Sequence, residues 1–269
     1  MPSLTALKPE PGTRGEPAVE DAFDRLVAEG RNRLHRPLLP LLATGLVGGI
    51  DVGVGVLAYL VIDRATGQPL LAAAGFTIGF VALLLARSEL FTENFMVPVA
   101  ALVTGHGSWL QLVRLWVVTL AANLAGGLAM AAVVDVALPG LGPTAARVGR
   151  HYATLGISWR SLLLAVLAGV VITLMTRMQH AADSLGPALV AAVGMSFVLV
   201  SARLLHSVLD SIFMFAGLVS GQAGYTWADW AGVLGWSVLG NVLGGVGLVT
   251  AIRLLRVTHR VQEERARQC

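Results

Sequence analysis

Ala86-Arg87-Ser88-Glu89-Leu90-Phe91-Thr92-Glu93-Asn94 interrupts an apolar run that extends from about Leu70 to Val103. The run is roughly 34 residues long, whereas a single membrane-spanning helix needs only about 20. The polar stretch therefore predicts a broken helix, with half-helices over Leu70–Leu85 and Asn94–Gly105. Irregular backbone at membrane depth is tolerated only where protein or a water-filled cavity satisfies its polar groups.

Charged residues in this stretch support the same interpretation. Arg87, Glu89 and Glu93 lie near the middle of the apolar run, and Asp51 lies in the apolar segment before it. An ionised side chain at the centre of a bilayer costs about 2.5–3.5 kcal/mol on insertion scales. A regular helix facing lipid would not carry these charges, so we expect them to face protein or an aqueous pathway.

A second stretch of the same kind occurs later in the chain. Ala202-Arg203-Leu204-Leu205-His206-Ser207-Val208-Leu209-Asp210 begins with the same Ala-Arg pair and has Asp210 where the first stretch has Asn94. It interrupts an apolar run from about Leu185 to Val219. We therefore expect a second broken helix.

A further motif follows each stretch. Asn123-Leu124-Ala125-Gly126-Gly127 starts 37 positions after Ala86, and Asn241-Val242-Leu243-Gly244-Gly245 starts 39 positions after Ala202. The chain thus consists of two halves with a period near 117 residues. Interrupted apolar segments at corresponding places in two halves point to a transport site near the bilayer midplane.

Composition limits the class of protein. Of the 269 residues, 55% are hydrophobic and 13% charged, and the mean hydropathy is +0.73; a soluble domain carries about 25% charged residues. We expect a polytopic membrane protein with no separate catalytic domain. Cys269 is the single cysteine, so disulfides and cysteine-based metal sites are excluded. No cofactor, metal or nucleic-acid partner is indicated.

Six apolar segments predict an all-α membrane protein with six transmembrane helices, two of them broken. The predicted crossings are 37–62, 70–103 (broken), 109–134, 161–178, 185–220 (broken) and 231–255. The corresponding divisions are an N-terminal tail over 1–36, a transmembrane channel or transporter domain over 37–256, and a C-terminal tail over 257–269. Residues 18–34 predict an amphipathic helix on the membrane surface, or else a loosely ordered tail.

The distribution of arginine predicts the topology. Arginines precede the first span and follow the last, and an excess of Lys and Arg marks the cytoplasmic side. We expect a multi-pass protein of the inner membrane with both termini in the cytoplasm. The connection 135–160 then lies outside, although it contains Arg147, Arg150 and Arg160. It is either a basic funnel that concentrates anions or a loop that tolerates charge.

His206 and Asp210 are the first candidates for chemistry. His206 is the one histidine expected deep in the membrane, where an imidazole can pass a proton near neutral pH. Asp210, one helical turn later, either orients His206 or caps the second half-helix; Asn94 is its counterpart as a cap in the first half. Half-helix N-termini aimed at a midplane site favour an anion.

Other polar residues are candidates to support the pore. Arg87 and Arg203 are equivalent in the repeat. We expect them to contact the substrate or else to pair with one of four acidic residues, namely Glu89, Glu93, Asp51 or Asp210. Each asparagine of the Asn…Gly-Gly motifs, Asn123 and Asn241, either lines the pore, holds the broken helices, or joins two helices beside close-packed glycines.

The loop Ser88-Glu89-Leu90-Phe91-Thr92-Glu93-Asn94, with the paired break at His206-Ser207-Val208-Leu209-Asp210, resembles the formate/nitrite transporter family. The resemblance covers roughly residues 37–256. It implies an aquaporin-like inverted repeat with one pore in each protomer of a homopentamer embedded in membrane lipid. Such proteins move small monovalent anions such as formate, nitrite, hydrosulfide or lactate, usually with a proton.

The resemblance also assigns residues. It makes His206 the central histidine, Asp210 the polar partner in the place of an asparagine, and Thr92 part of the loop that narrows the pore. The apolar constrictions that it implies are Phe76, Phe80, Leu90, Phe91 and Leu199.

The chain departs from the family pattern in several places. No lysine follows Lys8, so the lysine of the outer vestibule has no counterpart, and Arg150, His151 or Arg160 would replace it. Glu93 and Arg203 are charges that formate channels generally lack at these positions, and the often acidic position before the central histidine is Leu205.

The sequence therefore predicts a transporter or channel, and not an enzyme, in which a small weak-acid anion gains a proton at a relay of His206, Thr92 and Asp210. An aquaglyceroporin-like channel for neutral solutes is one alternative, although neither half has an Asn-Pro-Ala motif. A non-conducting membrane sensor or scaffold, closed by ion pairs among Arg87, Glu93 and Arg203, is another.

Overall fold

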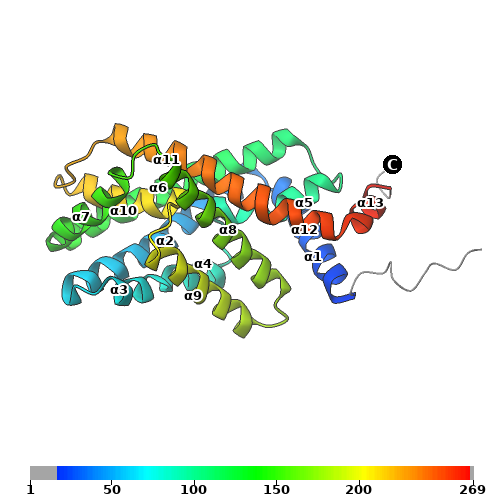
Figure 1. The fold of residues 1–269 in the computed structure, drawn as a ribbon, viewed down its shortest axis with the longest axis horizontal. Coiled ribbons are helices and arrows are strands. Elements are labelled where there is room, and N and C mark those ends of the chain that lie inside the picture. Colours follow the sequence, from blue (N-terminus) through cyan, green and yellow to red (C-terminus); the bar gives the residue numbers. More distant parts are fainter. Residues whose placement is uncertain (1–16, 267–269) are drawn as a thin grey trace, which may run out of the picture.

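The structure is a computed structural model that describes residues 17–266, and every regular element in that range is helical. Residues 1–16 and 267–269 of the two predicted tails lie outside the described residues. Figure 1 shows an elongated bundle in which α7 lies at one end and α1 and α13 lie at the other.

The helices of the first half and of the connection are α1 (Pro17–Leu34), α2 (Leu38–Thr66), α3 (Pro69–Phe76), α4 (Ile78–Ala86), η1 (Phe91–Phe95), α5 (Val97–Val103), α6 (Trp109–Ala137), η2 (Pro139–Leu141) and α7 (Gly142–Ala153). Those of the second half are α8 (Trp159–Ala181), α9 (Leu185–Ser201), α10 (Ser207–Val219), α11 (Trp227–Val242), the π-helical η3 (Leu243–Thr250), α12 (Ala251–Arg256) and α13 (Thr258–Ala266).

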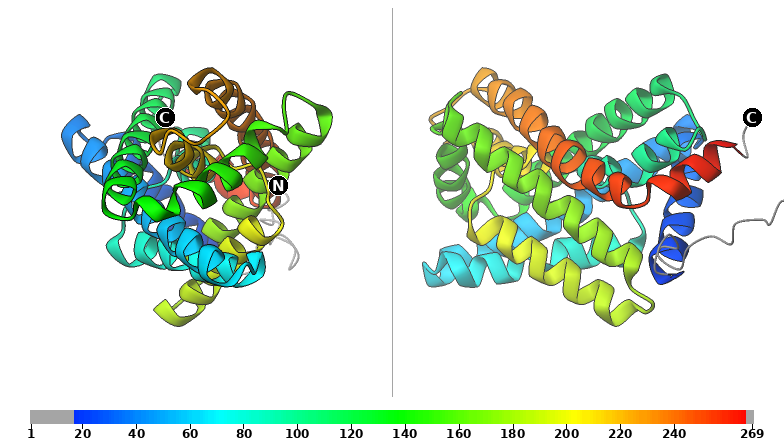
Figure 2. Two further views of the ribbon diagram at one scale, coloured as in Figure 1. Left: turned by 90° about the vertical axis from the view of Figure 1, so that its left-hand side faces the viewer. Right: turned by 45° about the vertical axis from the view of Figure 1, so that its right-hand side comes forward.

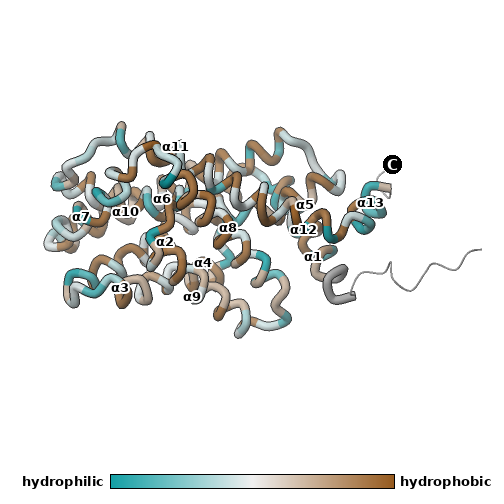
Figure 3. The backbone as a smooth tube through the Cα atoms, in the orientation of Figure 1, coloured by the Kyte–Doolittle hydropathy of each residue, from teal (hydrophilic) through white to brown (hydrophobic). Residues whose placement is uncertain are grey.

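Several of these helices have the length and composition of membrane spans. Five segments qualify, namely α2, α3 with α4, α6, α8, and α11 through α12. Shorter apolar helices are η1 with α5, α9 and α10. Apolar residues predominate along the middle of the bundle and hydrophilic ones gather at its ends (Figure 3). The chain is thus an all-helical protein that crosses the membrane several times.

Each of the two polar stretches separates a pair of helices. Helix α4 ends at Ala86 and α9 ends at Ser201, and the chain resumes a helix at Phe91 and at Ser207. The residue after each first helix is an arginine in the left-handed conformation, Arg87 at φ 53° and Arg203 at φ 49°. These are the only two non-glycine residues with positive φ in residues 17–266.

Close backbone contact joins the long helices within each half. A Cβ atom on Gly49 of α2 would lie 2.1 Å from the carbonyl oxygen of Asn123, and one on Gly169 of α8 would lie 2.1 Å from that of Asn241. Only glycine permits this approach, which is typical of helix packing in membranes. The two contacts bring Asn123 next to α2 and Asn241 next to α8, the first long helix of each half.

Residues 18–34, predicted as an amphipathic helix on the membrane surface or a loosely ordered tail, belong to the helix α1. Its apolar side chains, including Phe23 and Leu26, are buried against α5 and α13 rather than lying free on a surface. Figure 2 shows α1 beside the end of the chain that carries α13. Helix α1 therefore packs on α5, the helix that follows the first polar stretch.

The connection 135–160, treated as a loop in the sequence analysis, contains the helix α7. Pro143 stands in its first turn, where proline is tolerated. Val148 and Tyr152, four positions apart, are buried on the face that packs against α10. This spacing is that of a short amphipathic helix, and it brings α7 over the second half of the molecule.

Candidate functional site

The two polar stretches meet at one contact. Thr92 in η1 and His206 at the start of α10 are both fully buried, and Oγ1 of Thr92 lies 2.9 Å from Nε2 of His206. The residues are 114 positions apart in the sequence. The structure thus brings together, in the centre of the bundle, two of the three residues that the sequence analysis assigned to proton transfer.

The other ring nitrogen of His206 determines its tautomer. Nδ1 accepts a hydrogen bond from the backbone N–H of Leu209 at 3.1 Å and so caps the start of α10. An accepting Nδ1 carries no proton, so the neutral ring carries its proton on Nε2. Nε2 therefore donates to the hydroxyl of Thr92, and the Thr92 proton remains available to a substrate oxygen.

Asp210, the third of these residues, caps the backbone rather than orienting the imidazole. Its Oδ2 accepts the backbone N–H of His206 at 2.7 Å. Its other oxygen, Oδ1, is buried without a hydrogen-bond partner in the described part of the chain. A buried polar atom of this kind is uncommon in a native structure.

In the first stretch the corresponding backbone cap comes from Glu93 and not from Asn94. An oxygen of the Glu93 carboxylate accepts the backbone N–H of Leu90 at 3.3 Å. The Asn94 side chain instead accepts a hydrogen bond from Arg33 at 3.1 Å, and its amide points back to the Leu90 carbonyl at 3.4 Å. Asn94 thus lies deep in the site, but it connects the stretch to α1.

Asn123 and Asn241 hold the two stretches by matching hydrogen bonds. The Asn123 amide donates to the carbonyls of Gly45 and Glu89 at 2.7 and 2.8 Å, and its oxygen accepts the Phe91 N–H at 2.8 Å.

The Asn241 amide does the same in the second half. It donates to the carbonyls of Ala165 and Leu205 at 2.8 and 2.9 Å, and its oxygen accepts the Ser207 N–H at 2.9 Å. Of the roles considered for the two asparagines, the geometry corresponds to holding the interrupted helices. Each asparagine satisfies backbone groups that irregular chain leaves unpaired at membrane depth.

Two further side chains fix the outgoing end of the first stretch. The Trp116 indole donates to the carbonyl of Asn94 at 2.9 Å, and the hydroxyl of Thr250 donates to that of Phe95 at 2.9 Å. Thr250 lies at the end of the π-helical segment η3. The second half of the chain therefore helps to position the segment that carries Thr92.

Arg87 and Arg203 do not form the ion pairs that were expected. Both side chains are exposed, and no ion pair joins either to an acidic residue within residues 17–266. Asp51, one of the expected partners, accepts a hydrogen bond from Ser88 at 2.5 Å instead. Each arginine ends a helix in the left-handed conformation, and its side chain leaves the polar stretch instead of folding into it.

Glu89 is neutralised instead by Arg33, in the last turn of α1, and by Arg36, just after that helix. Arg36 lies 2.5 Å from one carboxylate oxygen of Glu89, and Arg33 lies 3.6 Å from the other. The Glu89 side chain is only 3% exposed. In the sequence, the arginines near the first span indicate only the topology, and their contact with Glu89 was not predicted.

A second set of charges continues this network along α1. Glu29 pairs with Arg33 one turn along α1 and lies 3.0 Å from Nε2 of His180 in α8. Burial acts to raise the pKa of Glu29, but the hydrogen bond with His180 and the positive charge of Arg33 outweigh it and hold that pKa well below its ordinary value. The spacing of Glu29 and Arg33, four residues apart, is the one signal in the sequence that points to this network.

The opposite end of the bundle contains a basic basin. An open depression of about 560 Å³ is lined by residues that include Arg147, Arg150 and His151 of α7. Arg147 forms an ion pair with Asp63. Burial and the charges of Arg203 and Arg160 hold the pKa of His151 below its ordinary value. His151 is therefore neutral near pH 7, and the permanent positive charges of the basin come from arginine.

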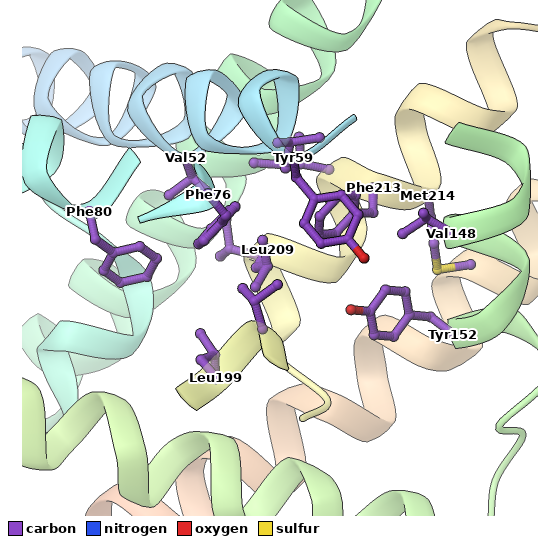
Figure 4. Packing of buried hydrophobic residues seen from close by; sticks show 14 of the residues in the cluster. Val52, Tyr59, Phe76, Phe80, Val148, Tyr152, Leu199, Leu209, Phe213 and Met214 are labelled. Atoms are coloured by element: carbon purple, nitrogen blue, oxygen red, sulfur yellow. The ribbon is translucent and has the colours of Figure 1, made fainter. Parts of the chain in front are cut away.

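The five residues assigned to pore constrictions lie in one apolar cluster. Phe76, Phe80, Leu90, Phe91 and Leu199 are each at most 2% exposed. The ring centroids of Phe76 and Phe80 lie 5.8 Å apart, and that of Phe213 in α10 lies 6.4 Å from Phe76 (Figure 4). Phe91 and Leu205, the chain neighbours of Thr92 and His206, belong to the same cluster, so the Thr92–His206 contact lies beside buried apolar side chains.

Known membrane proteins are similar to this chain in sequence and in structure. A family model described as formate/nitrite transporter matches residues 20–255. The chain is 33% identical over 105 residues to the inner membrane protein YfdC of Escherichia coli (strain K12), covering 36% of this chain and 34% of the relative.

Two further curated relatives are similar. The formate-nitrite transporter of Plasmodium ovale is 31% identical over 124 residues, which cover 42% of this chain and 40% of the relative. The uncharacterized transporter YrhG of Bacillus subtilis (strain 168) is 26% identical over 248 residues, covering 86% of this chain and 91% of the relative. The alignments to YfdC and to the Plasmodium protein thus span less than half of either relative.

Solved structures share the fold. A structure named FNT family ion channel has a TM-score of 0.78 at 20% identity and covers 88% of this chain and 98% of its own. One named pentameric formate channel with formate bound has a TM-score of 0.67 at 20% identity, with 82% and 98% coverage. These proteins are channels and transporters, not enzymes. The family match extends over most of the sequence, and this multi-pass membrane protein belongs to the formate/nitrite transporter family.

Proposed function

We propose that the protein transports a small monovalent weak-acid anion, such as formate or nitrite, together with a proton. The observation that carries the proposal is the 2.9 Å contact between Thr92 and His206 inside an apolar cluster. This contact supplies hydrogen-bond donors at the one buried place where the two polar stretches meet. The named relatives and structures support the substrate class.

The architecture that we propose is an inverted repeat of six crossings in which the second and fifth helices are broken. The matching hydrogen bonds of Asn123 and Asn241 support it, because two halves related by symmetry place equivalent groups in equivalent surroundings. The left-handed Arg87 and Arg203 support it as well. The name of the similar pentameric channel supports assembly as a homopentamer.

The proposed orientation places both termini in the cytoplasm of a cell whose inner membrane holds the protein, in contact with its lipid. Helices α1 and α13 lie at the same end of the bundle. That end contains Arg25, Arg31, Arg256 and Arg260, and basic residues favour the cytoplasmic side. The basin on α7 then opens to the outside. The proposed division is again a channel domain over 37–256 between two tails.

The proposed mechanism separates charge from the apolar path. The anion collects at the basic basin and passes the first apolar ring, which includes Phe76. It gains a proton in the region of His206, Thr92 and Asp210 and crosses the remaining ring as a neutral acid. An unpaired anion between phenylalanine rings loses its hydration without compensation, whereas a neutral acid loses far less. Thr92 and His206 replace part of that hydration by hydrogen bonds.

Uptake of radiolabelled formate into proteoliposomes tests this proposal. We expect saturable uptake that rises as the external pH falls, because a lower pH supplies more protons to the anion. In His206→Ala we expect the acid stimulation to be lost. His35→Ala is the matched control, since His35 lies at the end of α1 with its ring bonded to the Arg31 carbonyl and far from the site in sequence.

The outcomes separate the proposal from its alternatives. Wild-type flux that His206→Ala leaves unchanged removes His206 from the mechanism. Glycerol-driven osmotic swelling without formate uptake supports a neutral-solute channel. A folded oligomer that conducts neither supports a sensor or scaffold, although the ion pairs assumed for its closed pore are replaced by those of Glu89 with Arg33 and Arg36.

A further inference from the structure

Asp210 is a buried carboxylate with no cation beside it. The residue is 1% exposed, its Oδ2 binds the His206 N–H, and its Oδ1 is unpaired. No ion pair in the described range 17–266 involves it. An ionised carboxylate in such a place is costly, so a proton on Asp210 removes the cost and gives Oδ1 a hydrogen to donate.

Tyr152 connects Asp210 to the outer end of the bundle. Its hydroxyl lies beside the Asp210 carboxylate, and its ring stacks on Phe213 at a centroid distance of 6.1 Å. Burial raises the pKa of Tyr152 well above its ordinary value, so its hydroxyl stays neutral. Tyr152 belongs to α7, whose adjacent residue His151 lines the basin.

A second hydroxyl and a cation lie in the same region. In Figure 4 the hydroxyl groups of Tyr59 and Tyr152 point into the same space beside Phe213. Arg203 is exposed at the start of the second stretch, and its positive charge acts on Tyr59, Tyr152 and His151. This arrangement is a proton-bearing carboxyl, two neutral donors and one cation.

The other elements packed against α10 add little charge near Asp210. From α2, Tyr59 faces this region, and Asp63, one turn later, is paired with Arg147. Helices α6 and α11 carry Asp135 and Asp229 at their ends. From its own segment, Asp210 is near His206, whose ring is the neutral tautomer described above.

We infer that Asp210, Tyr152 and Arg203 form an outer protonation site for the transported anion. Arg203 attracts the anion to the tyrosine hydroxyls. The Asp210 O–H bond breaks as its proton passes to Oη of Tyr152, and the Tyr152 O–H proton passes to an oxygen of the anion. Tyr152 ends neutral, Asp210 ends as a carboxylate, and the substrate is now a neutral acid. The next proton reaches Asp210 from the basin along the same path.

The inference rests on the proposed function and makes it more specific, because it assigns the proton to Asp210 rather than to the His206 ring. The ring of His206 can accept a second proton only by giving up the Leu209 N–H that Nδ1 now binds. Asp210 Oδ1 has no such bond to break. Thr92 and His206 then stabilise the neutral acid after it has formed.

The test measures formate uptake and the accompanying proton flux in proteoliposomes of wild type, Asp210→Asn, Tyr152→Phe and Arg203→Gln. Asp210→Asn retains an acceptor for the His206 N–H but cannot exchange a proton. We expect it to lose the acid stimulation of uptake, Tyr152→Phe to lose most of it, and Arg203→Gln to raise KM while keeping the pH response. Asp229→Asn is the matched control, because Asp229 also caps a helix start but is exposed.

An infrared difference spectrum between acidic and neutral buffer adds a readout that does not depend on flux. We expect a protonated-carboxyl band in wild type and in Tyr152→Phe that is absent in Asp210→Asn. A wild-type pH profile in Asp210→Asn overturns this inference alone if His206→Ala still abolishes acid stimulation. If Asp210→Asn does not fold, unchanged acid stimulation in Tyr152→Phe overturns the inference. Absence of formate flux in wild type overturns the proposed function and this inference with it.

Discussion

The two polar stretches have the same backbone support but opposite electrostatic surroundings. Asn123 and Asn241 bind them by the same three kinds of hydrogen bond, with lengths that differ by at most 0.1 Å. In the first stretch, Glu89 is neutralised by two arginines at the end of the bundle that carries α1. In the second, Asp210 forms no ion pair within residues 17–266 and lies beside Tyr152.

This difference indicates a division of work between the halves. The Glu89 carboxylate, paired with two arginines, fixes the first stretch to α1. A carboxylate without a cation is free to exchange a proton. The asparagine hydrogen bonds, which both halves have, fix the backbone of each stretch. The surroundings of the two carboxylates differ, and they determine that the first stretch is anchored and that the second exchanges a proton.

The largest loss of stability is expected from removing the side chain of either Asn123 or Asn241. Asn123→Ala leaves the Phe91 N–H and two carbonyls without their partner, and Asn241→Ala does the same to the Ser207 N–H. Each change should cost about 3 kcal/mol or more, because each unsatisfied buried group costs roughly 1–3 kcal/mol. Thermal unfolding of the purified oligomer in detergent measures this. Similar losses support equivalence of the halves, and a loss confined to one variant argues against it.

A smaller and unequal effect is expected from neutralising the two carboxylates. Glu89→Gln leaves Arg33 and Arg36 with less compensation and should lower the stability by about 2 kcal/mol, in the range of hydrogen bonds to charged groups. Asp210→Asn removes no ion pair and should leave stability near that of wild type. The same unfolding assay compares them, and equal losses would contradict the division of work proposed here.

The smallest effect is expected from Glu29, whose contribution to stability depends on pH. Its pKa is lowered in the fold from the ordinary 4.5, so the ionised form stabilises the folded state. That contribution is complete above pH 4.5 and is lost as the pH falls through the lower folded value. The difference in unfolding temperature between wild type and Glu29→Gln should be constant from neutral pH to about 5 and shrink below 4.5. A difference that does not depend on pH would show that Glu29 acts through packing.

Much of the site could be predicted because charge is expensive inside a membrane. Polar residues inside apolar runs indicated the interruptions at Arg87 and Arg203 and the deep position of His206. They also indicated that Asn123 and Asn241 are equivalent positions of the two halves. The helical nature of residues 18–34 follows from their periodicity.

Other features required the tertiary structure. The partners of Glu89 lie 53 and 56 residues earlier in the chain, and nothing local in the sequence distinguishes Arg36 from the exposed Arg87. Tyr152 was missed because α7 reads as part of a polar connection, and only its packing on α10 brings its hydroxyl to Asp210.

The sequence by itself determined a membrane protein of two similar halves, each interrupted by a polar stretch, because hydropathy and repetition are local properties. The tertiary structure decided which nitrogen of His206 is protonated, which carboxylate is neutralised and which is not. Those outcomes depend on atoms that approach within about 3 Å from distant parts of the chain. A hydrogen bond or an ion pair exists only at such distances, so its partner is fixed by how the helices cross and not by the order of the residues.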